Sequence, residues 1–207
     1  MNAKTAKKGR PNRKALIIGA AETLLRDRGF SGVTTRAVAE AVPCSEGAIY
    51  VHFEDRLELL LEVLRASLPE MLVPLHALRG KIGKGTPEQN LVTTVEGLLR
   101  FHGRVAPMLC SLITEPKLLH RFRRSLEDEG KGPDRGILTL ANYIAEEQRL
   151  GRIVADVDAK TAAGVLMASS FFHSFTQGLL GSTSKLDSRR LVRLAIQSRE
   201  RTNRSPN

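Results

Sequence analysis

The sequence is poor in the residues that build disulfide frameworks and zinc sites. Its 207 residues include only two cysteines, Cys44 and Cys110, which are far apart and form no CxxC pair. This argues against a disulfide scaffold or a zinc knuckle and fits a reducing compartment. The first residues are basic and polar with no apolar core behind them, which is not the pattern of a signal peptide. We therefore expect a cytoplasmic protein.

Catalytic motifs are lacking as well. The sequence has no Gly-x-Ser-x-Gly, no His-Glu-x-x-His and no Glu-x-x-His pair of the kind that a helical di-iron bundle needs. Its five histidines are scattered, and a lone histidine is more often a packed or surface group than a ligand. We predict no enzyme, no catalytic residue, no metal site and no cofactor.

No continuous apolar run is long enough to span a membrane. Residues 161–184 carry no charge, but serines, His173, Thr176 and Gln177 interrupt the segment. No part of the chain has the alternating pattern of a β-strand. We expect an all-α protein with no membrane partner, in which this segment is a buried helix.

Positive charge is abundant and unevenly distributed. The formal net charge of +10 indicates a polyanionic partner, either nucleic acid or an anionic membrane face. Residues 1–11 are predicted to be a disordered basic arm, because they are basic and lack apolar periodicity. Lys8 and Arg10 flank a glycine in a flat, extended stretch that can enter a narrow minor groove. The alternative is a charged tail that keeps the protein soluble.

The segment 33–53 has the pattern of two short helices around a tight break. Thr34 or Thr35 can cap the first helix, Pro43 stops it, and Ser45 can cap the second. Ile49 and Phe53 supply apolar anchors four residues apart. This is a helix-turn-helix, which fits a major groove, although the same pattern also occurs in ordinary helical cores.

Helices are expected on both sides of this segment. A first helix follows Asn12 and ends at Gly29, and a further helix follows the capping box of Asp55 and Glu58. Pro69 is expected to break or kink that helix, which ends near Arg79, and residues 80–86 are expected to form a flexible loop. The remaining predicted elements are helices at 87–102, 116–126, 137–150, 158–180 and 186–196, with a separate apolar stretch at 106–113.

Residues 13–61 resemble the DNA-binding domain of the TetR family of bacterial transcriptional regulators. The matching residues are Ala20-Ala21, Leu24-Leu25, Gly29-Phe30, Thr34-Thr35, Val38-Ala39, Ser45 to Tyr50, His52-Phe53 and Leu57. The resemblance implies a three-helix DNA-binding domain at residues 12–68. It also implies a larger helical domain for effector binding and dimerisation at residues 69–207.

The resemblance also assigns roles at the DNA. It implies phosphate contacts by Thr35, Tyr50, His52 and Arg56, and base-edge positions for Arg36, Ser45, Glu46, Ala48 and Val51. Lys8, Arg10 and Lys14 complete the predicted DNA-binding set. Glu46 either accepts from a cytosine amine or favours the helix N-terminus. Pro43 stands where the family usually has a turn glycine, so the turn must close in another way. Arg56 stands where the family usually has a lysine, and either cation can contact a phosphate.

The helix at 158–180 is apolar on all sides and therefore needs a partner on the face that its own core does not cover. We predict a homodimer, with an interface formed by Ala163, Met167, Ala168, Phe171, Leu191 and Leu194. The alternative is a central helix buried within a monomer. By resemblance, the aromatic and thioether side chains of this domain line an effector pocket, formed by Phe101, His102, Met108, Phe122, Tyr143, Met167, Phe171, Phe172 and Phe175, with His173 and Gln177 as further polar groups.

These observations predict a dimeric, sequence-specific transcriptional regulator. Its expected partners are a near-palindromic double-stranded operator, a second copy of the chain and a small, largely apolar effector that releases it from DNA. The alternative of another class is a helical-bundle enzyme or a small-molecule carrier without a DNA-binding role.

Overall fold

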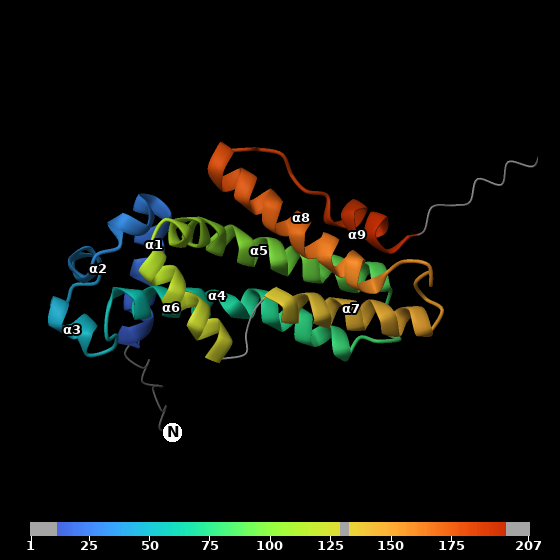
Figure 1. Cartoon of the computed structure of the whole chain (residues 1–207), viewed down its shortest axis with the longest axis horizontal. Coiled ribbons are helices and arrows are strands. Elements are labelled where there is room, and N and C mark those ends of the chain that lie inside the picture. The colour runs from blue at the N-terminus through green and yellow to red at the C-terminus, as the bar shows by residue number, and fades with distance from the viewer. Residues whose placement is uncertain (1–11, 129–132, 198–207) are drawn as a thin grey trace, which may run out of the picture. The chain divides into compact units, whose positions relative to one another are not determined.

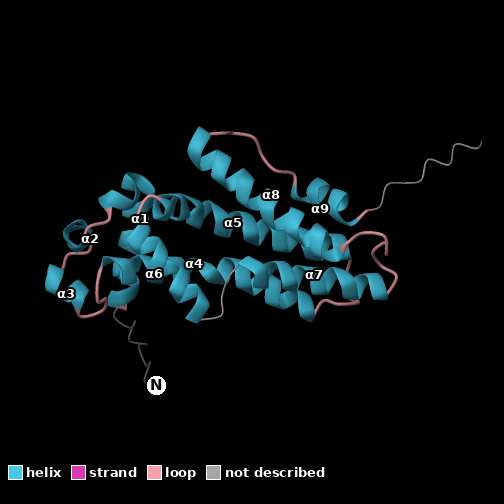
Figure 2. Ribbon diagram, viewed as in Figure 1, coloured by secondary structure: helices cyan, strands magenta, loops and turns pink. Residues whose placement is uncertain are grey.

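The computed structural model describes residues 12–128 and 133–197, and within these ranges it contains nine α-helices and no strand (Figures 1 and 2). This confirms the prediction of an all-α fold. The described residues separate into two compact units between Ala66 and Ser67. The helices are α1 (Arg13–Gly32), α2 (Thr35–Ala41), α3 (Glu46–Tyr50), α4 (Arg56–Arg79), α5 (Pro87–Ile113), α6 (Pro116–Asp128), α7 (Pro133–Arg149), α8 (Ala159–Leu180) and α9 (Ser188–Ile196).

Side-chain caps set the beginnings of the first three helices. The side chain of Asn12 accepts from the backbone N–H of Lys14, that of Thr34 from Ala37, and that of Ser45 from Ala48. Thr34 is therefore the cap of α2, which settles the choice between the two threonines.

Glycine ends the regular part of α1. Gly29 adopts a φ of 67°, which favours glycine, and the chain turns so that Phe30 is buried.

Pro69 was expected to break or kink the helix; it does not break it, because α4 continues through Pro69 and Pro74 and ends at Arg79, as expected. A proline has no N–H, so Pro74 leaves the carbonyl of Glu70 without its intrahelical donor. The helix α5 approaches this point closely, since Gly97 presents no side chain there. Close packing of α5 therefore accompanies the proline at position 74 inside α4.

The close approach of α5 to α4 at Gly97 predicts that a larger side chain there lowers the stability of the protein. A Cβ atom at this position would lie 2.6 Å from the Cγ of Pro74 and 2.8 Å from the carbonyl oxygen of Glu70. We expect Gly97→Ala to destabilise the protein by about 1–3 kcal/mol through overpacking. Gly103 on the same helix has no atom within 4 Å of such a Cβ, so Gly103→Ala should stabilise by up to about 1 kcal/mol. Urea unfolding of both variants measures the difference, and equal effects would contradict this account.

The second unit is built on α5, which is one continuous helix. The sequence predicted a break near His102, but the helix runs from Pro87 to Ile113 with Pro107 inside it. Figure 1 shows α8 packed along α5 and α7, and α9 also packs on α5. The core between these helices contains Leu91, Val95, Leu98, Leu140, Tyr143, Ile144, Ala163, Leu166, Met167, Val192 and Ile196.

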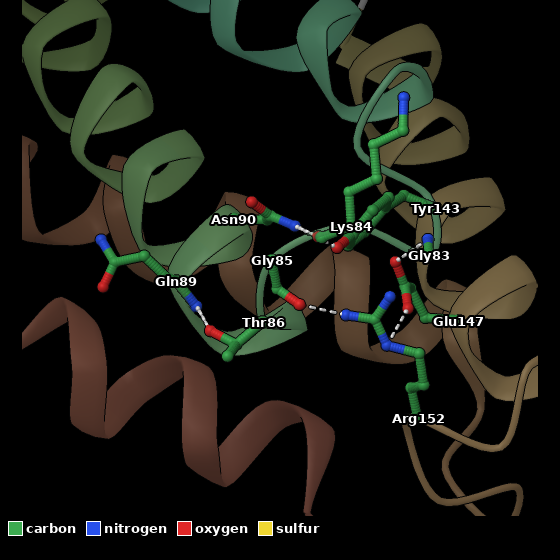
Figure 3. A network of polar contacts seen from close by, with 9 residues as sticks. All are labelled: Gly83, Lys84, Gly85, Thr86, Gln89, Asn90, Tyr143, Glu147 and Arg152. Atoms are coloured by element: carbon green, nitrogen blue, oxygen red, sulfur yellow. Dashed lines mark hydrogen bonds and ion pairs between the residues drawn. The ribbon is translucent and has the colours of Figure 1, made fainter.

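The loop between α4 and α5 is held by hydrogen bonds, and so differs from the flexible loop expected (Figure 3). The N–H of Gly83 donates to Oε1 of the buried Glu147 at 3.0 Å. The Nδ2 of Asn90 donates to the carbonyl of Lys84 and to the hydroxyl of Tyr143, each at 2.9 Å. Arg152 lies 3.3 Å from Glu147 and also donates to the carbonyl of Gly85. These hydrogen-bond partners come from distant parts of the sequence, so the composition of the loop alone could not predict that it is held in place.

Burial raises the pKa of Tyr143 to about 12 although Asn90 donates to its hydroxyl. The phenol therefore remains neutral across the physiological range. Among the described helices, none is long and apolar enough to cross a membrane.

Candidate nucleic-acid interface and effector site

One side of α3 is buried and the opposite side is open. Ile49 and Phe53 are buried in the first unit, whereas Tyr50 and Val51 are exposed, Val51 to 79%. A Cβ atom built at Gly47 would meet only the hydroxyl of Ser45, at 3.8 Å. The first turn of α3 is therefore slim and accessible, which is what a close approach to base edges requires.

Two carboxylates lie among the predicted DNA contacts. The hydroxyl of Thr35 donates to Oε2 of Glu46 at 2.8 Å, which links the beginning of α2 to the beginning of α3. The Nε of Arg36 donates to Oε1 of Glu40 at 3.1 Å, and the Arg36 side chain is 81% exposed. Thr35 thus gives its one hydroxyl proton to the protein rather than offering it to a phosphate. Glu40 was absent from the predicted set, although its position four residues after Arg36 was a usable signal.

Arg56 has an internal role that the sequence did not predict. Its guanidinium lies 4.3 Å from the centre of the Phe30 ring, and its Nη2 donates to the Phe30 carbonyl. Lys14 likewise pairs with Glu62 at 3.0 Å and lies 5.6 Å from the centre of the Phe53 ring. In this structure both cations hold the first unit together.

The other predicted DNA contacts are distributed as follows. Ser45 caps α3 and is exposed, whereas Ala48 and His52 are half-buried. Lys8 and Arg10 lie outside the described residues. The turn containing Pro43 closes through the N–H of Cys44, which donates to the carbonyl of Ala39 at 3.3 Å, so no positive φ is needed there.

The ion pairs of Glu62 make the first unit sensitive to acid. Burial alone would raise the pKa of Glu62, but hydrogen bonds from Lys14 and Arg65 outweigh it and lower the pKa below 4.5. A carboxylate with a lowered folded pKa stabilises the protein above its unfolded pKa, and this contribution disappears as the pH falls through the folded pKa. We expect the melting temperatures of wild type and Glu62→Gln to differ most near neutrality and to converge below about pH 4.5. A difference that is constant with pH would count against the ion pairs.

Several predicted effector-site residues come together between α5 and α8. The His102 ring lies 5.3 Å from that of Phe101 and 5.5 Å from that of Phe171, which in turn stacks on Phe175 at 6.3 Å, all between ring centres. Met108 and Met167 are buried. Four other predicted residues are not in these ring contacts. The hydroxyl of Tyr143 accepts from Asn90, and Phe172 is 66% exposed. Phe122 is half-buried on α6, and Gln177 donates to the carbonyl of Ser184.

His102 is a neutral polar group in this apolar cluster. Its Nδ1 lies 2.9 Å from the hydroxyl of Ser170, and that hydroxyl donates to the carbonyl of Met167 at 2.8 Å. Because a hydroxyl has one proton, Nδ1 must carry the hydrogen, which makes Nε2 the acceptor. Burial lowers the pKa of His102 to about 4, so the ring is uncharged at neutral pH.

The predicted dimer-interface residues divide between the core and the surface. Ala163 and Met167 are buried within their own unit and offer almost no surface to a second chain. Ala168 and Leu194 are exposed, Leu194 to 74%, and Phe171 and Leu191 are half-buried. Val165, Phe172 and Leu179, which were not part of the predicted interface, are also exposed and share one side of α8 with Ala168. Their spacing of three, four and seven residues was the available signal.

Comparisons with known proteins match the segment that contains α2 and α3 to DNA-binding regulators. The sequence model described as "Bacterial regulatory proteins, tetR family" matches residues 17–63. The chain is 24% identical over 207 residues to the HTH-type transcriptional repressor BepR of Brucella suis biovar 1 (strain 1330), covering 90% of each chain. It is 27% identical over 100 residues to the HTH-type transcriptional repressor KstR2 of Rhodococcus jostii (strain RHA1), covering 47% of this chain and 49% of that one.

Solved structures share the fold over most of the chain. A TetR transcription regulator from Haloarcula marismortui ATCC 43049 has a TM-score of 0.68 at 18% identity, over 89% of this chain and 96% of that chain. The regulator FadR from Bacillus subtilis, solved in complex with stearoyl-CoA, has a TM-score of 0.63 at 16% identity, over 88% and 97%.

The matched residues 17–63 include all of α2 and α3, which contain the open reading surface. The protein is a DNA-binding transcriptional regulator and not an enzyme, so the alternative of a helical-bundle enzyme is set aside. Residues 17–63 form a DNA-binding domain of the tetR family of bacterial regulatory proteins.

Proposed function

We propose that the protein is a homodimeric repressor that binds a near-palindromic operator and leaves it when a small, largely apolar effector binds. The observation that carries this proposal is the slim, exposed first turn of α3, from Ser45 to Ala48, beside the exposed Arg36. Two copies of such a surface, related by a two-fold axis, can contact half-sites one helical turn apart. Both similar proteins named above are repressors.

The exposed apolar residues of the second unit support a dimer. Val165, Phe172, Leu179 and Leu194 leave a large apolar area on α8 and α9 in contact with water. Such a surface is costly in a monomer and is typical of an interface between identical chains.

The effector site is proposed around Phe101, His102 and Phe171, where aromatic rings surround one neutral hydrogen-bonding group. An apolar ligand with a single polar atom matches this chemistry. The helix α4 extends from Arg56 in the first unit to Arg79 in the second, so it provides a continuous connection for the response. If effector and operator binding are coupled, each must weaken the other by the same factor.

A gel-shift experiment with genomic fragments tests the DNA-binding proposal. We expect tight binding to a site with an inverted repeat, such as one upstream of the protein's own gene, and a steep loss of affinity with salt. Titration of apolar compounds against this labelled site then tests effector release. Absence of a preferred fragment would overturn the operator, and unchanged affinity at saturation with compounds that raise the melting temperature would overturn the release mechanism.

The basic arm is expected to supply much of the electrostatic affinity. Between Thr35 and Phe53 there are two acids and one arginine, so this surface by itself attracts phosphates poorly. We expect removal of residues 1–11 to weaken operator binding by about 10-fold or more at about 0.1 M salt, and the slope of log affinity against log salt to become shallower by about 0.9 for each phosphate that the arm neutralises. An unchanged slope would favour the alternative of a solubilising tail.

A further inference from the structure

Two carboxylates on the DNA-facing surface need an explanation, because phosphates repel them. Glu40 and Glu46 are both exposed, and each accepts a hydrogen bond from a residue predicted to contact DNA. Glu40 holds Arg36 within α2, and Glu46 holds Thr35 across the turn between α2 and α3. The two pairs are adjacent, since Thr35 and Arg36 are consecutive residues.

The contact between Glu40 and Arg36 uses only one side of the guanidinium group. The carboxylate accepts from Nε at 3.1 Å, and no contact to the two terminal nitrogens occurs among the described residues. An ion pair this exposed adds little to stability. Its effect is to restrict a long side chain while the outer N–H groups remain available, and these match the O6 and N7 atoms of guanine.

The contact between Glu46 and Thr35 similarly uses one oxygen of the carboxylate. Oε2 accepts from the Thr35 hydroxyl at 2.8 Å, and the described residues provide no partner for Oε1. A carboxylate has acceptors only. In the major groove it therefore accepts from the N4 amine of cytosine and is repelled by the acceptor atoms of guanine and thymine.

We propose that Arg36 and Glu46 are specificity-determining residues that read a guanine and a cytosine, on the same or neighbouring base pairs of each half-site, and that Glu40 and Thr35 position them. The proposal rests on the operator binding described above. A role of Glu46 in capping α3 does not explain the contact, because Ser45 already caps this helix and the Glu46 carboxylate is directed to Thr35. The acidic groups lower affinity for all DNA but penalise incorrect bases, which increases discrimination.

Selection from a random duplex library by the full-length protein tests this proposal. Wild type should enrich half-sites that contain both the guanine and the cytosine. Glu46→Gln should replace the cytosine preference by adenine, because an amide pairs with the adenine N6 and N7 atoms, with at least about a 10-fold change in relative affinity. Thr35→Val should relax the cytosine position alone, and Glu40→Gln the guanine position alone. Glu96→Gln, at an exposed position on α5, is the control and should enrich the wild-type site.

The outcomes separate this proposal from operator binding itself. If Glu46→Gln selects the wild-type site, or if Glu40→Gln weakens all sequences equally, the assignment of readers and positioning residues is wrong while operator binding stands. If wild type enriches no sequence, both are wrong. All three positions are on the surface of the first unit, so we expect unchanged melting temperatures, and a variant that melts early is replaced by the corresponding alanine variant.

Discussion

Phe172→Glu is expected to convert the protein from a dimer to a monomer at micromolar concentration. Phe172 is 66% exposed and lies on the same side of α8 as Val165 and Leu179. Placing a charge in an apolar interface imposes a desolvation cost that no partner offsets, so we expect dimerisation to weaken by on the order of 100-fold or more. Sedimentation velocity measures the change directly.

The same substitution should weaken operator binding to a similar extent. A dimer places a second reading surface beside the duplex at high effective concentration, and a monomer loses this advantage. Ile113→Glu is the matched control, because Ile113 is exposed to 70% and belongs to α5 rather than α8 or α9. A control variant that dissociates equally, or a wild-type protein that is monomeric at these concentrations, would refute the proposed interface.

Local sequence signals were sufficient to predict where most helices of the first unit begin and end. Hydroxyl and amide caps at Asn12 and Ser45 act within three residues, and Gly29 has the one backbone conformation that only glycine adopts easily. The roles of Arg56 and Lys14 were not predictable in this way. Arg56 packs on Phe30, 26 positions earlier in the sequence, and Lys14 pairs with Glu62, so each role depends on tertiary contacts.

In the second unit, the periodicity of apolar residues did not predict the helix lengths or the buried side of α8. Pro69 was expected to break or kink its helix and a separate stretch was expected at 106–113, yet α4 continues through Pro69 and α5 through Pro107. Apolar residues surround α8 on all sides, and the second unit buries only some of them. The pattern did not show which side faces inward, and two of the predicted interface residues, Ala163 and Met167, proved to be core.

Arg152→Ala is expected to be among the most destabilising substitutions in the second unit. The Glu147 side chain is fully buried, and Arg152 is the cation that lies beside it, at 3.3 Å. Breaking a buried ion pair by removing one partner leaves an uncompensated charge, at a cost of about 3 kcal/mol. For a chain of this length the melting temperature should fall by roughly 6–12 °C. Arg149→Ala removes an exposed pair with Glu146 on α7 and should cost less than about 1 kcal/mol.

A double substitution separates the effect of charge burial from that of packing. Gln at position 147 keeps an acceptor for the N–H of Gly83 but removes the buried charge, so Glu147→Gln combined with Arg152→Ala should be more stable than Arg152→Ala alone. If Arg152 acted mainly by packing or through its bond to the Gly85 carbonyl, the two effects would add and the double variant would be the less stable one. Denaturant unfolding of the four proteins of this cycle therefore distinguishes the two causes. A positive result would show that Arg152 stabilises the second unit mainly by compensating the buried carboxylate of Glu147.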